Sequence, residues 1–151
     1  TVKGLEGINL TLCCREDEWE ANRHYYNTNF TNINIVHVSG EKLKRIYNET
    51  DIFALIWESH SYLDFAMPVK VFESLGYGVP ILTLKGSQAA RFIKEEDIGW
   101  VVENIDEARI LLTYLKNNPN EIKTKKEKAF EARKRHTWEA RAIQVAKTLT
   151  N

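Results

Sequence analysis

The chain has 151 residues, a length typical of one domain, and it can bury a core without disulfides. Hydrophobic residues make up 43% and charged residues 28%, which excludes a disordered chain and a collagen-like repeat. The 21 basic residues balance the 21 acidic ones, so the overall charge does not favour nucleic acid as a partner.

The sequence shows no targeting or membrane-spanning segment. No apolar run approaches the ~20 residues that cross a bilayer, and Thr1-Val2-Lys3-Gly4 is not a signal-peptide start. We therefore expect a cytoplasmic protein, and we expect this chain to be a piece of a longer one because it does not begin with methionine. Segment 116–136 holds eight basic and three acidic residues. Either it contacts anionic lipid at the inner face of the membrane, or it is a solvated helix face.

Five short apolar runs alternate with segments of helix length. The runs are Ile8–Cys14, Ile33–Val38, Ile52–Trp57, Pro80–Leu84 and Ile98–Val102. Their richness in Ile, Val and Leu is typical of strands buried on both faces of a parallel sheet. The order is β-α repeated five times, followed by two more helices. This alternation predicts one α/β domain with a doubly wound parallel sheet of about five strands and helices on both faces.

Several helix boundaries can be read from local residue types. Asp17 with Glu20 resembles a capping pair for the first helix, and Asn104 is placed to cap a later one. Pro68 suits the first turn of a helix that Gly76 ends.

The loop after the third strand is the longest at the ligand-binding edge. Open parallel sheets bind ligands at the carboxyl ends of their strands. Segment 58–67 lies there and carries polar and aromatic side chains just before a helix, whose N-terminal N–H groups attract phosphate. The chain has neither the glycine-rich dinucleotide pattern nor a P-loop, which argues against classical NAD and ATP sites.

Segment 67–83 carries the most specific pattern in the chain. It contains the pair Phe72-Glu73, the turn Gly78-Val79-Pro80 and the apolar strand Ile81–Leu84. This arrangement resembles the C-terminal donor-binding domain of GT-B-fold glycosyltransferases, of the group 1 or family 4 type. Weaker similarities extend the resemblance over residues 8–150. The resemblance implies a Rossmann-like domain that binds a nucleotide-diphosphate sugar.

The resemblance assigns Glu73 to the ribose hydroxyls. A carboxylate can accept two charge-assisted hydrogen bonds from a cis-diol, although an exposed helical glutamate is common anywhere. The resemblance also implies that Ser39 and Gly40 lie near the base, although Ser39 is equally suited to cap the following helix. Lys70 lies one turn before Glu73, where it meets either a phosphate or solvent.

Contacts to the pyrophosphate and the sugar are assigned less directly. Thr83 and Ser87 are candidates to approach either group from the next loop. The family often carries an acidic residue eight positions before the ribose glutamate, for the donor sugar, and here that residue is Phe65. Asp64 or Glu58 could take its place, and His60 is a third candidate in the same loop.

The implied activity is transfer of a sugar from a nucleotide-diphosphate donor to a hydroxyl of a glycan or lipid-linked acceptor, in polysaccharide or glycan biosynthesis. No cofactor is expected, and no metal, because the four histidines show no ligand spacing. We expect the family's first β-α unit, with its diphosphate-binding Arg/Lys pair, and its acceptor domain to lie upstream of Thr1. We therefore expect the isolated chain to be inactive.

Two other hypotheses remain open from the sequence. One is a flavodoxin-like regulatory or partner-binding domain, whose acidic cluster would be Glu16-Asp17-Glu18. That hypothesis lacks an aspartate at the end of the third strand, because Asp51 precedes the strand. The other is a GT-B-type sugar-nucleotide epimerase.

Overall fold

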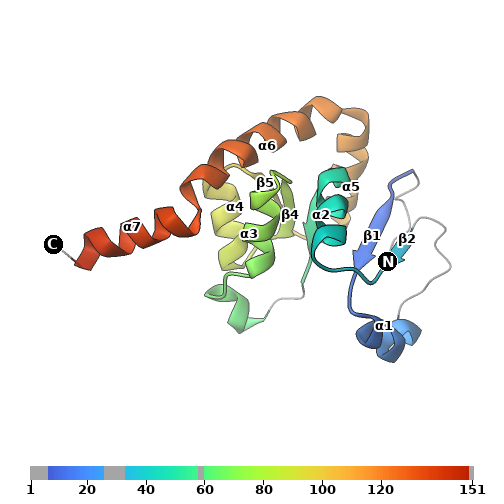
Figure 1. The fold of residues 1–151 in the computed structure, drawn as a ribbon. Helices are drawn as coiled ribbons and strands as arrows, with labels where there is room; N and C mark the ends of the chain where they lie inside the picture. Colours follow the sequence, from blue (N-terminus) through green and yellow to red (C-terminus); the bar gives the residue numbers. More distant parts are fainter. Residues whose placement is uncertain (1–6, 26–32, 58–59, 150–151) are drawn as a thin grey trace. The chain divides into compact units, whose positions relative to one another are not determined.

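The computed structural model describes residues 7–25, 33–57 and 60–149 (Figure 1). The chain divides into two compact units, unit 1 over residues 1–46 and unit 2 over residues 47–151. The boundary falls within helix α2 (Glu41–Glu49).

Unit 1 contains a pair of parallel strands. Its elements before α2 are β1 (Leu10–Cys13), α1 (Glu16–Asn22), the 3₁₀ helix η1 (Arg23–Tyr25) and β2 (Ile33–Val36). Strands β1 and β2 pair in parallel, with Leu10 opposite Ile33 and Cys13 opposite Val36. None of the described residues in this unit is buried. The expected burial of the first strand on both faces is therefore wrong. Apolar composition predicts a strand, but it does not predict which elements pack against that strand.

The start of α1 differs from the expected one. Arg15 precedes the helix and no side chain caps it. Asp17 instead lies inside the first turn and forms an ion pair with Arg15 at 2.8 Å. The predicted Asp17 cap is therefore wrong.

Unit 2 contains three parallel strands and most of the helices. Its elements are β3 (Phe53–Leu55), the 3₁₀ helix η2 (Ser61–Asp64), α3 (Val69–Gly76), β4 (Ile81–Leu84), α4 (Gln88–Glu95), β5 (Gly99–Val102), α5 (Ile105–Asn117), α6 (Pro119–Ala132), the 3₁₀ helix η3 (Arg133–Arg135) and α7 (Trp138–Leu149). The strand order is β3-β4-β5, with Ile81 opposite both Phe53 and Gly99.

The predicted α/β fold is confirmed. Along the described residues five strands alternate with helices, as in a Rossmann-like fold, and the strands pair in parallel within each unit; two further helices follow (Figure 1). The strands are hydrogen-bonded as two sheets, β1-β2 and β3-β4-β5. In unit 2 both crossovers advance in the same direction across the sheet. Right-handed connections therefore place α3 and α4 on the same face.

The core of unit 2 forms where helices cover β3 and β4. Its buried members are Leu55, Val71, Leu75, Ile81, Ala89, Ile93, Ile98, Ala129 and Ala132. Helix α5 packs against β4 and β5, while α6 packs against α3 and α5. Strand β4 is accordingly buried along most of its length. The expectation of a strand buried on both faces is correct there.

A glycine–proline corner joins α3 to β4. The buried Ser74 hydroxyl donates to the Val79 carbonyl at 2.9 Å, and the Val79 N–H donates back to the Ser74 carbonyl at 3.0 Å. Gly78 has a φ of +69°, and a Cβ there would lie 2.7 Å from the Phe130 ring. Only glycine fits this turn without strain. The corner therefore fixes the end of α3 and the start of β4.

Candidate functional site

Helix α3 begins at the carboxyl edge of the three-stranded sheet. The chain leaves β3 at Leu55, crosses residues 56–68 and enters α3, which then leads to the amino end of β4. Ligands of open parallel sheets bind at this edge. The segment before α3 and the first turns of α3 therefore form the candidate site.

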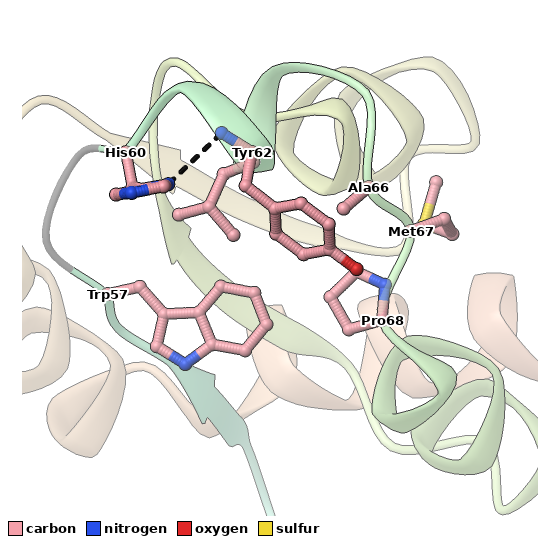
Figure 2. Close-up of a pocket in the computed structure, with 7 residues that line it drawn as sticks. Trp57, His60, Tyr62, Ala66, Met67 and Pro68 are labelled. Carbon is pink, nitrogen blue, oxygen red and sulfur yellow. Dashed lines mark hydrogen bonds between the residues drawn. The ribbon is translucent and has the colours of Figure 1, made fainter.

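A pocket of about 440 Å³ lies in this segment (Figure 2). Its lining residues are Trp57, His60, Tyr62, Leu63, Ala66, Met67 and Pro68. Figure 2 shows the Trp57 indole and the Tyr62 ring lining the same hollow, and both side chains are exposed. The size and apolar lining are typical of a small-molecule site, where a few polar groups orient the ligand.

His60 is the lining residue best suited to a polar contact. Its Nδ1 accepts a hydrogen bond from the Tyr62 N–H at 3.1 Å, which caps the 3₁₀ helix η2. Because Nδ1 accepts in this bond, Nε2 carries the ring proton and can donate to a ligand.

The other two candidates for the donor sugar are placed differently. Asp64 is not among the residues that line the pocket, and its backbone carbonyl accepts a hydrogen bond from Arg91. Glu58 lies outside the described residues. Of the two candidates that the structure describes, it brings His60 but not Asp64 to the pocket.

Glu73 lies in the second turn of α3 with its side chain 37% exposed. One carboxylate oxygen, Oε2, accepts from Lys70 Nζ at 2.8 Å and from the Tyr47 hydroxyl at 3.3 Å. Within the described ranges, the other oxygen, Oε1, accepts no hydrogen bond. The carboxylate therefore keeps one oxygen open for a ligand hydroxyl.

Lys70 shares the first turns of α3 with Glu73. Its side chain is 53% exposed, and its bond to Glu73 uses one of the three N–H donors of an ammonium group. An acceptor for hydroxyls and a donor for phosphate thus stand side by side on one helix.

Thr83 and Ser87 serve the fold. Thr83 is buried at the end of β4, and its hydroxyl donates to the Leu55 carbonyl of β3 at 2.8 Å. Ser87 caps α4, its hydroxyl oxygen accepting from the Ala90 N–H at 3.0 Å. Both hydroxyls thus have structural roles that need no ligand.

Ser39 and Gly40 lie in unit 1, directly before α2, and both are exposed. Gly40 has a φ of +56° and its carbonyl accepts from the Lys44 N–H at 3.1 Å. Glycine adopts this left-handed backbone without the strain that a side chain would add. The predicted contact of these residues with a base stays a prediction.

Sequence reasoning missed Tyr47, and it left Trp57 without a role. The Tyr47 hydroxyl binds Glu73, which lies 26 positions later in the chain, and no local motif predicts such a contact. Trp57 follows β3, and its place at a strand end was the signal that could have found it.

Several basic residues in and next to α6 form ion pairs with acidic residues elsewhere in the chain. Lys125 and Lys128 both bind Asp97, and Lys126 binds Asp51 at 2.7 Å. Arg135 binds Glu96. This pairing reduces the charge left for an anionic lipid surface. None of the helices in the described ranges combines the length and the hydrophobicity of a membrane span.

Two carboxylates beside this segment have lowered pKa values. The hydrogen bonds from Lys125 and Lys128 lower the pKa of Asp97. Burial opposes ionisation of Glu96, but hydrogen bonds from Arg135 and His136 outweigh it, so its pKa is lowered too. An ionised carboxylate with a lowered pKa stabilises the fold at pH values above the usual carboxyl pKa. That contribution is lost as the pH falls through the lowered pKa.

We expect Asp97→Asn to reduce the acid sensitivity of the fold. Asn tolerates the left-handed backbone that Asp97 adopts, with a φ of 55°, so the turn is kept. The wild-type free energy of unfolding should fall more steeply than that of the variant between about pH 5 and pH 2. Urea unfolding at a series of pH values measures both slopes, and equal slopes would contradict the role of Asp97.

No metal-binding cluster is present in the part of the chain that the structure describes. Groups of three or more His, Cys, Asp or Glu side chains placed to hold an ion do not occur there.

Comparison with known proteins gives one family. A family model described as glycosyl transferase-like matches residues 1–147. No curated protein matches the chain. The family match includes the pocket before α3, the Lys70–Glu73 pair and the glycine–proline corner. The chain therefore belongs to the glycosyl transferase-like family.

Proposed function

We propose that unit 2 binds the nucleotide-diphosphate sugar donor of a glycosyltransferase. The observation that carries the proposal is the Glu73 carboxylate, which is held through Oε2 and open at Oε1 beside the Lys70 ammonium. A carboxylate oxygen suits ribose hydroxyls and an ammonium group suits phosphate. Family membership adds sugar transfer as the chemistry.

The donor would lie along the carboxyl edge of the sheet. Glu73 accepts from the ribose, and Lys70 with the N-terminal N–H groups of α3 faces the diphosphate. The sugar ring enters the pocket, where the rings of Trp57 and Tyr62 cover its apolar face. His60 Nε2 donates to a sugar hydroxyl.

The transfer breaks the bond between the anomeric carbon and the diphosphate oxygen and forms a bond to the acceptor oxygen. The acceptor hydroxyl gives its proton to water, and the leaving diphosphate carries the bonding electrons away. Lys70 and the α3 N-terminus would stabilise that charge as it develops. The pocket holds the sugar in place, which lowers the entropic part of the barrier. The acceptor would be bound by a part of the protein outside this chain.

Calorimetric titration of the full chain with UDP, GDP and ADP tests the proposal. We expect saturable binding of at least one of them. Glu73→Gln should weaken it about tenfold, because it removes a charged acceptor from a ribose hydroxyl. No saturation by any of the three would contradict the proposal.

Glu131→Gln is the matched control. Glu131 also pairs with a lysine three residues away, Lys134 Nζ, at 2.8 Å, but it lies on α6. The control should bind the nucleotide as the wild type does. Equal affinities of Glu73→Gln and the control would remove Glu73 from the site.

A further inference from the structure

We infer that Tyr47 is a positioning residue that orients the Glu73 carboxylate toward its ligand, an inference that rests on the proposed function. The Tyr47 hydroxyl donates to Oε2 of Glu73 at 3.3 Å. Tyr47 is 6% exposed, and its ring stacks on the ring of Tyr77, with the centroids 4.7 Å apart and the planes 13° apart. The ring of Phe53, the first residue of β3, lies with its centroid 6.2 Å from the centroid of the Tyr47 ring.

Tyr47 supplies the rigidity that the Lys70 pair lacks. Lys70 and Glu73 are an i,i+3 pair on a partly exposed helix face, and such pairs hold their geometry weakly. Tyr47 comes from α2 and reaches Glu73 on α3 from a buried ring that has few conformations open to it. The carboxylate is thus fixed from a second element.

Tyr47 and Lys70 bind the same oxygen of the Glu73 carboxylate, which leaves the other oxygen for a ligand. Both Tyr47 and Lys70 bind Oε2, so the carboxylate is pinned by one oxygen and presents the other. A ligand that meets an already oriented acceptor does not have to order it on binding. Tyr47 therefore raises the affinity for a ribose hydroxyl without touching the ligand.

Tyr47→Phe tests this by removing the hydroxyl and keeping the stacked ring. It should weaken binding of the best nucleoside diphosphate about fivefold, which is the cost of ordering one side chain. Binding of the 2′,3′-dideoxy analogue should stay unchanged, because that analogue has no hydroxyl for Glu73. In a Glu73→Gln background the substitution should add no further loss. Tyr77→Phe, which keeps the ring beneath Tyr47, is the control and should bind normally.

The outcomes separate the two proposals. If Glu73→Gln weakens binding and Tyr47→Phe does not, this inference is overturned and the donor site stands. If Tyr47→Phe weakens the ribonucleotide and the dideoxy analogue equally, Tyr47 has a structural role only. If neither substitution matters, the donor site itself is wrong.

If Tyr47→Phe does not fold, a second variant, Tyr77→Ala, tests the same inference. Tyr77→Ala removes the ring that stacks on Tyr47 and leaves the Tyr47 hydroxyl in place. It should weaken binding of the ribonucleotide alone. Unchanged affinity would overturn the inference. Thermal unfolding by circular dichroism confirms that each variant is folded.

Discussion

Replacing Gly99 with alanine is expected to lower the free energy of unfolding of unit 2 by about 3 kcal/mol or more. A Cβ on Gly99 would lie 1.9 Å from the Ile81 carbonyl oxygen and 2.7 Å from the Ile81 nitrogen. These atoms belong to the backbone of β4, and the Ile81 N–H donates to the Ile98 carbonyl at 3.1 Å. They can move only if the pairing of β4 with β5 is disrupted. Urea unfolding followed by circular dichroism measures the loss.

Gly76→Ala is the matched control for Gly99→Ala. A Cβ on Gly76 would meet nothing within 4 Å, and the residue closes helix α3. Alanine favours a helix over glycine, so the free energy of unfolding should stay equal or rise by up to about 1 kcal/mol. Wild-type stability in Gly99→Ala would contradict the packing of β4 against β5.

The second large effect is expected from Ile93→Ala. Ile93 projects from α4 and is completely buried among core residues that include Ile81 and Ile98. Removing its side chain leaves a cavity that the core closes only in part. The substitution should lower the free energy of unfolding by about 2–5 kcal/mol, measured in the same urea experiment.

Ile110→Ala makes the same chemical change at a solvated position. Ile110 lies on α5 and is 71% exposed, so the substitution should change the stability by less than about 1 kcal/mol. If the two variants lost equal stability, Ile93 would not be part of the core described above.

The order of elements could be predicted because it depends on local composition. Each of the five apolar runs contains one strand, and the strands end within a few residues of the predicted bounds. Asn104 caps α5 as predicted, accepting from the N–H groups of Asp106 and Glu107. Caps of this kind depend only on neighbours in the chain.

Burial and long-range contacts could not be predicted in the same way. The sequence of β1 is as apolar as that of β4, yet three of its four residues are exposed. Thr83 lies near the carboxyl end of β4, where a ligand-binding hydroxyl was expected, but its partner is the carbonyl of Leu55, 28 positions away. Such partners depend on which elements become neighbours in the fold.

The candidate site combines contacts that the sequence predicts with contacts that it does not. The neighbourhood of Lys70 and Glu73 follows from helical spacing, since residues three apart share a face. The contact of Tyr47 with Glu73 joins residues 26 positions apart, so helical spacing does not predict it. The glycine–proline corner could be found from sequence, and the structure adds its consequence, which is to anchor the end of the helix that carries Glu73.

The location of bound nucleotide tests the central claim most directly. Amide shifts of the ¹⁵N-labelled chain would be followed by NMR during titration with the nucleoside diphosphate that binds best. The proposed donor site predicts that the largest changes fall on α3, on the pocket residues before it and on Tyr47, and that Glu73→Gln reduces them at a given concentration. Changes confined to α5 and α6, or none at saturating nucleotide, would contradict the assignment of Glu73 to a nucleotide-sugar donor.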